Sequence, residues 1–364
     1  MKKISVTLDG NHLSSHDVCI GKNILDRIGF LIAGSGAVSR RVIISDSTVA
    51  SLYGEAVLEA FGKAGADCAM ITFPAGEESK NIDTVLAVVS DLTTLQVDRA
   101  SELIALGGGV TGDIVSFVAS IYMRSIPYVH VPTTLLAQVD SSIGGKTGIN
   151  LPAGKNLLGT FHQPRGTYID IQFLKTLPEE EYLNGLSEIV KYGVIEDTTL
   201  LDLLENSIED IRERKPQLLR QLVERSCMIK KNIVEMDETD RGLRRILNFG
   251  HTLGHAVEAE SGYRVSHGKA VALGMIASAR ISEELKYLTH RERIRIETII
   301  GELGLPCQIP AKISTAGIIS RLKHDKKKKG DALHFVLLKK LGVPFMNGAV
   351  EESLIHNIVE DLKQ

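Results

Sequence analysis

The first half of the chain alternates short apolar runs with segments of helical periodicity. Apolar runs lie at 42–45, 68–73, 102–106 and 128–131, and helical segments at 48–63 and after Asn81 separate them. Such alternation favours a parallel sheet, which binds ligands at the carboxyl ends of its strands. The strict alternation at 4–8 predicts an exposed strand. A hairpin at 146–156 and a short strand at 167–170 complete this half.

The pattern becomes mostly helical after Phe173. Helical periodicity covers 179–196, 200–214 and 217–235, and a further helix carries His251 and His255. The run 333–338 is the late strand candidate, and Pro344 demotes 343–345 to an edge strand or a loop. We therefore expect an α/β fold with two domains. Residues 1–171 would form a parallel-sheet, NAD-binding domain, and residues 172–364 a mainly helical domain for metal and substrate.

Composition is ordinary for a globular protein that works in water. The chain has 364 residues, enough for two cores, with 43% apolar and 24% charged residues. A net charge of -3 gives no reason to expect nucleic acid or an acidic membrane as a partner. The four cysteines form no CxxC pair, and no apolar leader follows Met1. We expect a cytoplasmic protein with reduced thiols.

The segment 244–258, RRILNFGHTLGHAVE, suggests a metal site. His251 and His255 lie four residues apart, so they project from one helical face. Glu188 lies upstream and His267 downstream. One carboxylate and two imidazoles from separate segments make a three-ligand site with an open position, as catalytic zinc requires. The alternative is that these histidines are hydrogen-bonded structural residues.

A glycine-rich turn follows the run 102–106. The segment 107–113, GGGVTGD, fits the G-x-G-x-x-G pattern, in which a helix N-terminus holds a pyrophosphate. The usual acidic partner about 20 residues later is missing here, and Asp46, after an earlier strand, is our candidate for the ribose hydroxyls. The polar segment 76–80 would lie over the adenosine half of a nucleotide, or is simply an exposed loop.

The segment 132–164 has the composition of a phosphate site. Lys146 and Lys155 lie beside glycines, so that an ammonium group and backbone donors can reach the same anion. Polar side chains that could join them are Thr133, Thr134, Asp140, Asn156 and His162. A solvated surface loop is the alternative.

Together these motifs resemble the 3-dehydroquinate synthase family of sugar phosphate cyclases. The resemblance runs from about Asp46 to Asp325 and rests on the segments GGGVTGD, YMRSIPYVHVPTTLLAQVDSSIGGKTGIN, AGKNLLGTFHQP, LSEIVKYG, LNFGHTLGHAVE and HGKAVALGM. It implies an NAD- and metal-dependent lyase of the shikimate pathway, which makes precursors of chorismate and the aromatic amino acids. Such an enzyme converts 3-deoxy-D-arabino-heptulosonate 7-phosphate into 3-dehydroquinate and phosphate.

The resemblance also implies roles for individual residues. Glu188, His251 and His267 would hold zinc or cobalt, while His255 would face the substrate. Arg124 would reach the phosphate in a neighbouring subunit's site, which implies a homodimer. The other substrate residues would be Asp140, Lys146, Asn156, Lys191, Lys230, Arg244, Asn248 and Lys326. We expect NAD to contact Asp46, Glu77, Lys80, Gly108, Gly109, Val110, Asp113, Thr133, Thr134, Lys146, Lys155, Phe173 and Thr176.

Two positions and three alternatives stay open at this point. The family usually has glutamate where this chain has Lys269, and four consecutive lysines make the register of Lys326 ambiguous. A polyol dehydrogenase of the glycerol dehydrogenase type would share the two-domain plan, but it has no need of a phosphate site. A sibling cyclase that makes an inosose or a valiolone is an alternative closer to the 3-dehydroquinate synthases. A non-catalytic NAD-binding protein would have no chemical reason to keep three metal ligands.

Overall fold

The computed structural model of the chain describes residues 1–8, 15–36, 38–329, 334–347 and 350–363, with the backbone alone for 324–329. It contains two compact units. Unit 1 comprises Met1–Leu177 and Leu219–Thr239, and unit 2 comprises Pro178–Leu218 and Asp240–Gln364. The functional division at residues 171 and 172 stays a prediction.

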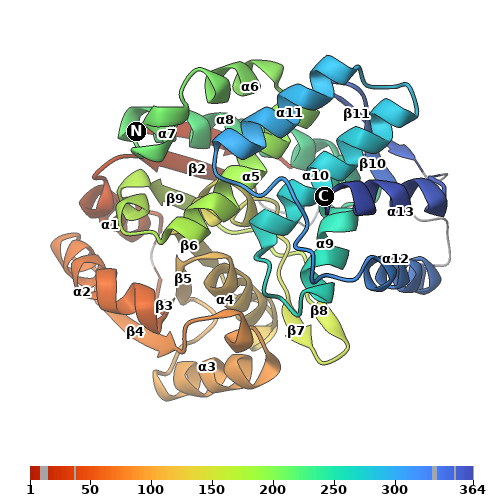
Figure 1. The fold of residues 1–364 in the computed structure, drawn as a ribbon. Helices are drawn as coiled ribbons and strands as arrows, with labels where there is room; N and C mark the ends of the chain where they lie inside the picture. The colour runs from red at the N-terminus through yellow and green to blue at the C-terminus, as the bar shows by residue number, and fades with distance from the viewer. Residues whose placement is uncertain (9–14, 37, 330–333, 348–349, 364) are drawn as a thin grey trace. The chain divides into compact units, whose positions relative to one another are not determined.

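Unit 1 is built on a seven-stranded sheet in the order β1-β2-β9-β6-β5-β3-β4 (Figure 1). The strands are β1 (Lys2–Val6), β2 (His16–Gly21), β3 (Arg41–Asp46), β4 (Cys68–Phe73), β5 (Glu102–Gly107), β6 (Tyr128–Pro132) and β9 (Gly166–Asp170). Only the pairing of β1 with β2 is antiparallel within this sheet. The expected α/β fold with a parallel sheet is therefore confirmed.

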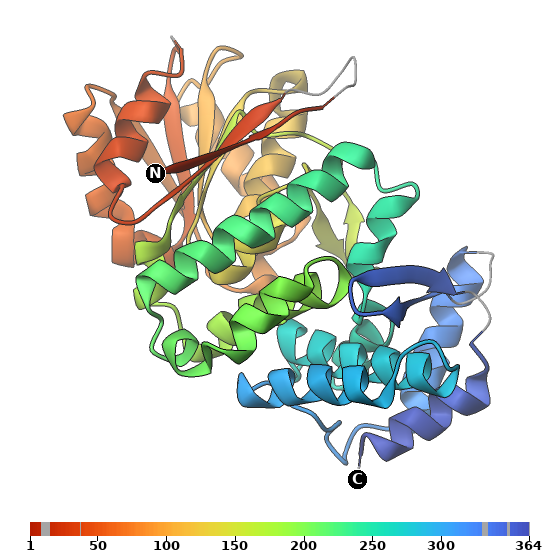
Figure 2. The same ribbon diagram turned by 90° about the horizontal axis from the view of Figure 1, so that it is seen from above.

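Helices cover both faces of this sheet (Figure 2). The helical segments of unit 1 are α1 (Leu25–Ala33), α2 (Ser47–Lys63), η1 (Glu77–Ser79), α3 (Ile82–Thr94), α4 (Gly109–Ile121), η2 (Tyr122–Arg124), η3 (Ala137–Ser141) and η4 (Ile171–Lys175). Most of α8 (Pro216–Met236) belongs to this unit as well. A separate hairpin consists of β7 (Ile149–Leu151) and β8 (Gly154–Leu158).

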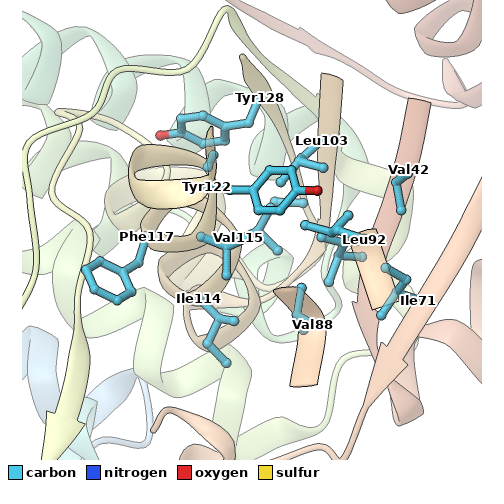
Figure 3. Packing of buried hydrophobic residues seen from close by; sticks show 14 of the residues in the cluster. Val42, Ile71, Val88, Leu92, Leu103, Ile114, Val115, Phe117, Tyr122 and Tyr128 are labelled. Atoms are coloured by element: carbon cyan, nitrogen blue, oxygen red, sulfur yellow. The ribbon is translucent and has the colours of Figure 1, made fainter. Parts of the chain in front are cut away.

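Side-chain alternation along the strands gives the sheet two cores. Val42 and Ile44 of β3 pack with α3 and α4, and Figure 3 shows Val42 in this cluster with Leu92 and Val115. Ile43, between them, packs on the other face with α1 and α2. A strand that is apolar on both faces must be covered on both. This is why the runs read as continuously hydrophobic in the sequence.

Unit 2 is mainly helical. Its elements are α5 (Glu179–Ile195), α6 (Thr198–Glu205), α7 (Ile208–Arg212), η5 (Leu243–Asn248), α9 (His251–Glu260), α10 (His267–Glu284), α11 (His290–Glu302), α12 (Thr315–Lys329), β10 (Phe335–Lys340), β11 (Val343–Asn347) and α13 (Glu352–Asp361). Helix α10 is buried on nearly every face and packs against α5, α9 and α11. A helix surrounded by others in this way forms the core of the unit.

Most predicted elements are present, but one expected helix is divided and two further elements were not predicted. The expected helix 200–214 is two helices, α6 and α7, which are separated at Asn206 and Ser207. Strand β2 and helix α1 were not predicted. The segment with Pro344 forms β11, in a two-stranded sheet where each strand is an edge, as proline requires. Among the described residues, no helix combines the length and apolar character needed to cross a lipid bilayer.

Candidate functional site

The three predicted metal ligands come together in unit 2. Nε2 of His251 lies 3.5 Å from Oε1 of Glu188, and Nε2 of His267 lies 3.6 Å from the same oxygen. Ligands about 2.1 Å from a tetrahedral zinc ion are roughly 3.4 Å apart, so these separations are those of a ligand set. Glu188 is buried, and both histidines are partly exposed. One carboxylate and two imidazoles are a donor set that fits zinc or a similar divalent ion.

A close contact between helices α9 and α10 supports this geometry. Gly250, at φ +80°, precedes α9 in a left-handed conformation, and His251 is the first residue of that helix. A Cβ at Gly274 of α10 would lie 1.8 Å from the carbonyl oxygen of Gly250, so only glycine permits the approach of the two helices. His267 is the first residue of α10. Tight packing of α9 against α10 therefore aligns two helix N-termini, each of which begins with a histidine.

The second nitrogen of each histidine also faces an acceptor. Nδ1 of His251 lies 3.2 Å from the carbonyl oxygen of Phe249. Nδ1 of His267 lies 3.6 Å from Oε2 of Glu258, a buried carboxylate of α9. Metal-binding histidines commonly have such partners, because these fix the tautomer and direct the other nitrogen at the metal. The surroundings of the triad therefore also fit a metal site.

Lys191 sits against the carboxylate of Glu188. Its side chain is 2% exposed, and its ammonium forms an ion pair with Oε2 of Glu188 one turn earlier on α5. A buried lysine requires a charged partner of this kind. Oε1 of Glu188 faces the two histidines while Oε2 faces Lys191. The carboxylate thus joins a predicted substrate residue to the metal triad.

His255 does not belong to this compact triad. Its side chain is exposed, and its ring lies 5.3 Å from that of His251 and 6.0 Å from that of His267. A second possible ligand group combines His255, Glu258 and His267. The i, i+4 spacing thus places His251 and His255 side by side, and His255 remains the proposed substrate-facing histidine.

The two triad histidines have opposite pKa shifts. Burial lowers the pKa of His251 to about 3, although Glu188 opposes this shift. Burial also lowers the pKa of His267, but hydrogen bonding and charge interactions with Glu188 and Glu258 raise it to about 9. His251 is thus neutral at physiological pH, which is the form in which a histidine can bind a metal ion. His267 must lose a proton before it binds a cation.

The other predicted substrate residues of unit 2 lie on η5 and α12. Arg244 is buried within η5, and Asn248 is exposed at the last position of the same segment. Lys326 lies in α12, but its side chain is outside the described residues. Lys269, the departure from the family pattern, forms an ion pair of 2.8 Å with Glu180 of α5. Both side chains of this pair are partly exposed.

In unit 1 the glycine turn has the expected form. Strand β5 ends at Gly107, Gly108 caps α4, and Gly109 begins the helix, with Val110 next. Asp113, in the second turn, forms an ion pair of 2.5 Å with Lys80. Burial raises the pKa of Asp113, and Lys80 offsets part of that rise. The turn therefore brings backbone donors and a paired charge to the end of a parallel strand.

Lys80 and Glu77 are tied to the β7–β8 hairpin. Nζ of Lys80 donates to Oδ1 of Asn156 over 2.6 Å, and Oε1 of Glu77 accepts from Nδ2 of Asn150 over 2.7 Å. Predicted cofactor and substrate residues thus lie in one hydrogen-bonded network. Asn150 was not among the predicted site residues.

Asp46 has a structural role that the sequence did not suggest. Its Oδ1 caps α2 by accepting from the backbone N–H groups of Thr48 and Val49, and its Oδ2 accepts from Thr111 over 3.2 Å. Capping is the common use of aspartate before a helix. Its predicted contact with the ribose remains a prediction.

The remaining cofactor residues occupy two places. Thr133 and Thr134 follow β6; the Thr133 amide donates to Gly107, and the Thr134 hydroxyl accepts from Ala137. The carbonyl oxygen of Phe173 and the hydroxyl of Thr176 both contact Tyr53. The first pair lies beside the glycine turn, whereas the second pair is held by α2.

The remaining predicted substrate and phosphate residues of unit 1 include one close ion pair. Lys230 of α8 lies 2.9 Å from Oδ1 of Asp140 and also donates to its carbonyl oxygen. Lys146 and Lys155 are exposed, and Arg124 is an exposed residue at the end of η2. His162 contacts the carbonyl oxygen of Ile126, so it is a structural residue here.

Two residues that sequence reasoning missed are Glu258 and Asn150. Glu258 lies seven residues after His251, a spacing that returns to the same helical face. That spacing was the available signal. Asn150 carried no comparable signal, because its partners Glu77 and Asn156 come from separate segments.

Comparison with known proteins covers nearly the whole chain. Residues 70–184 match the family model described as 3-dehydroquinate synthase N-terminal, and residues 185–328 match the model described as 3-dehydroquinate synthase C-terminal. The 3-dehydroquinate synthase of Geobacter sp. (strain M21) is 46% identical over 94% of this chain and 93% of its own length.

Two solved structures are also similar. The first is 2-epi-5-epi-valiolone synthase from Streptomyces hygroscopicus subsp. jinggangensis 5008 with NAD+ and Zn2+ bound. It has a TM-score of 0.89 and 30% identity over 98% of this chain and 99% of its own. A 2-deoxy-scyllo-inosose synthase complexed with carbaglucose-6-phosphate, NAD+ and Co2+ has a TM-score of 0.89 and 27% identity over 99% of this chain and 100% of its own. The chain belongs to the 3-dehydroquinate synthase family.

Proposed function

We propose that this chain converts 3-deoxy-D-arabino-heptulosonate 7-phosphate into 3-dehydroquinate and inorganic phosphate. The observation that carries the proposal is the cluster of Glu188, His251 and His267 with Lys191 paired to Glu188. Such a cluster in a chain 46% identical to a 3-dehydroquinate synthase is what this lyase reaction requires. We expect the enzyme in the cytoplasm.

Residues of unit 1 would bind NAD. Backbone N–H groups at the start of α4 suit the pyrophosphate, because a helix N-terminus attracts anions. Glu77, Lys80 and Asp113 would surround the nucleotide, and Thr133 and Thr134 lie beside the turn. When bound, NAD supplies a reversible hydride acceptor at C5 of the substrate. The two similar structures with bound NAD+ support this assignment.

Residues of unit 2 would hold one divalent ion, zinc or cobalt. Glu188, His251 and His267 supply the three protein ligands and leave a position for substrate oxygen. When bound, the ion supplies Lewis-acid polarisation of the C5 oxygen. Phe249 and Glu258 hold the ring nitrogens that face away from it.

Charged side chains would bind and orient the sugar phosphate. Lys146, Asn156 and Arg124 suit the phosphate, and Lys230 with Arg244 suits the carboxylate. Oxidation at C5 acidifies the proton at C6, so phosphate leaves by β-elimination, and the substrate phosphate can accept that proton. Once C5 is again a carbinol, the ring would open and an intramolecular aldol closure would form the carbocycle. His255 is exposed, and we expect it to move protons in these steps.

Two sibling activities compete with this proposal. The valiolone and inosose synthases share the fold at TM-scores of 0.89, but they are 30% and 27% identical. The 46% identity to a 3-dehydroquinate synthase favours the shikimate reaction. A polyol dehydrogenase would use the same cofactor and metal without releasing phosphate.

We further propose that the enzyme acts as a homodimer in which Arg124 serves the neighbouring subunit's site. Met123, Arg124 and Ser125 have φ values of 49°, 70° and 99°, so three successive non-glycine residues are left-handed. Such strain typically costs roughly 1–3 kcal/mol per residue and is found at functional sites. Ile121 and Met123 beside it are 45% and 42% exposed. A strained loop with exposed apolar neighbours is suited to a subunit contact.

The test of the reaction follows phosphate and NADH together. Purified protein is incubated with the heptulosonate phosphate and substoichiometric NAD, and the product is identified. We expect many phosphates per NAD, a flat NADH absorbance and 3-dehydroquinate as product. NADH formed stoichiometrically from a simple polyol, with the heptulosonate phosphate untouched, would instead identify a dehydrogenase. Formation of a valiolone or an inosose in place of 3-dehydroquinate would identify a sibling cyclase.

A further inference from the structure

Asn150 connects two segments that carry predicted ligand-binding residues. Its Nδ2 donates to Oε1 of Glu77 over 2.7 Å, and its Oδ1 accepts from the backbone N–H of Asn156 over 3.0 Å. Its own backbone N–H donates to the carbonyl oxygen of Lys80 over 2.8 Å. One residue therefore uses its amide side chain and its backbone to tie the 77–80 segment to the β7–β8 hairpin.

The side chain of Lys80 also belongs to this hydrogen-bonded network. Its Nζ donates to Oδ1 of Asn156 over 2.6 Å and pairs with Oδ2 of Asp113 over 2.5 Å. The Lys80 side chain is 7% exposed. A buried ammonium group depends on its hydrogen-bond and ion-pair partners, because a buried charge that loses them is destabilising. The glycine-turn helix, the 77–80 segment and the hairpin are thereby connected.

The conformation of Asn156 makes it dependent on this network. Its φ of 54° is left-handed, a conformation that non-glycine residues adopt rarely. Its backbone N–H is held by Asn150 and its side chain by Lys80. Without these two bonds little would keep Asn156 in the orientation described. The hairpin itself is short, and apart from Ile149, which is buried in the core of unit 1, its side chains are partly or fully exposed.

We propose that Asn150 is a positioning residue that couples cofactor binding at Glu77 and Lys80 to the orientation of the substrate residue Asn156. The proposal rests on the proposed function, which assigns NAD to the 77–80 segment and sugar phosphate to Asn156. NAD that fixes Glu77 and Lys80 also fixes the hairpin, so the anion meets an ordered Asn156. By thermodynamic reciprocity, the bound anion strengthens NAD binding by the same factor.

A purely structural role for Asn150 predicts something different. If Asn150 only stabilised the hairpin, its loss would weaken the hairpin equally with and without NAD. If it couples two sites, its loss removes the difference that NAD makes. The informative quantity is therefore the effect of NAD on the hairpin, and that effect can be measured with NAD alone.

The test compares Asn150→Ala and Asn150→Asp with the wild type. The aspartate variant keeps the acceptor for Asn156, but it loses the donor to Glu77 and places two carboxylates together. Asp83→Asn is the matched control, because Asp83 is an exposed carboxylate in the first turn of α3, outside the 77–80 segment, and makes no described side-chain bond to the hairpin. Circular dichroism checks that each variant is folded. If Asn150→Ala does not fold, the comparison is made with Asn150→Asp alone.

Amide hydrogen exchange is followed at 77–80 and at 149–158, with and without saturating NAD. In the wild type and Asp83→Asn we expect NAD to slow exchange in both segments. In both Asn150 variants we expect NAD to slow exchange at 77–80 only. Inorganic phosphate is the probe in a second titration. It should tighten NAD binding by roughly tenfold in the wild type, within the usual 5–150-fold range of coupling, and by less than twofold in the variants.

The outcomes separate the inference from the proposed function. Hairpin protection that survives in both Asn150 variants, or no protection in the wild type, overturns the coupling. Wild-type protein that shows the coupling but releases no phosphate from the heptulosonate phosphate overturns the proposed function and leaves the coupling intact. Phosphate release together with NAD-dependent hairpin protection that disappears in both variants supports both.

Discussion

Oε2 of Glu258 lies 3.6 Å from Nδ1 of His267, whose Nε2 lies at the same distance from Glu188. A carboxylate behind a ligand histidine fixes the ring and increases its basicity, and its removal commonly costs about 10–100-fold in metal affinity. We expect this weakening in Glu258→Ala and a smaller one in Glu258→Gln. Zinc affinity is measured by chelator competition. Glu260→Gln, on the same helix but paired with Arg321, should bind zinc like the wild type.

The metal triad itself makes a stronger prediction. His251→Ala, His267→Ala and Glu188→Gln should each lose both the bound divalent ion and turnover, because each removes one of three ligands. His290→Ala is the control, since its histidine is exposed and pairs with Glu283. Elemental analysis gives the metal content per chain. Equal metal in the wild type and in all three variants would exclude this triad as the site.

The Glu188 variant should also be less stable. Lys191 is buried against Glu188, and breaking a buried ion pair typically costs roughly 3–5 kcal/mol. We expect Glu188→Gln to unfold at a lower denaturant concentration than His251→Ala, both in chelator. A double variant with Lys191→Met should regain part of the loss. If Glu188→Gln unfolds together with the histidine variant, the pair contributes little.

The raised pKa of His267 predicts a pH dependence with a defined sign. In the metal-free protein this pKa is about 9, against 6.5 ordinarily, because hydrogen bonding and charge from Glu188 and Glu258 outweigh burial. The resulting stabilisation is fully present below pH 6.5 and is lost as pH rises through 9. We expect the melting temperature of the metal-free wild type to fall over this range relative to His267→Gln.

The same proton opposes metal binding. His267 must be neutral to bind a cation, so metal affinity should rise with pH up to about 9. Below that pH, binding should release about one proton, which calorimetry in buffers of different ionisation enthalpy can count. His251, with a pKa of about 3, should contribute no proton. Affinity that is constant between pH 6.5 and 9 would contradict this account.

The sequence predicted the sheet well because buried parallel strands leave a local signal. Continuous apolar runs such as Val42–Ser45 identified β3, which packs on both faces. Helices α6 and α7 were merged because Leu200, Leu204 and Ile211 continue one helical pattern across the break at Ser207. Apolar periodicity alone does not report a change of backbone direction.

The site was predictable only in part for a related reason. The i, i+4 spacing revealed His251 and His255, but the compact triad joins His251 to Glu188 and His267 from other helices. Their proximity depends on the close approach of α9 and α10 at Gly250 and Gly274, which local pattern does not encode. The family resemblance supplied those assignments. It did not point to Asn150, whose partners meet only in the folded chain.

Lys269 should matter little for metal binding. It forms an exposed pair with Glu180 at the starts of α10 and α5, and such pairs contribute about 0–1 kcal/mol. We expect Lys269→Ala to lower the free energy of unfolding by no more than this and to keep full metal content. Lys269→Glu would gain from the helix N-terminus but would face Glu180, so it should differ little from the alanine variant. Loss of metal in Lys269→Ala would assign this residue a role at the site.

Arg124 gives the prediction that separates a monomeric site from a shared one. Losing a charge-assisted contact to phosphate costs about 1.5–3 kcal/mol, so Arg124→Ala should be strongly impaired in turnover while it remains folded. Arg99→Ala is the control, since Arg99 is also an exposed arginine of unit 1.

Active protein should sediment as at least a dimer. Mixing Arg124→Ala with Lys191→Ala should restore activity, because each hybrid dimer would contain one intact site if Arg124 acts across the interface. Subunit exchange is verified with two differently tagged chains. Exchange without any recovery would place Arg124 in the site of its own subunit.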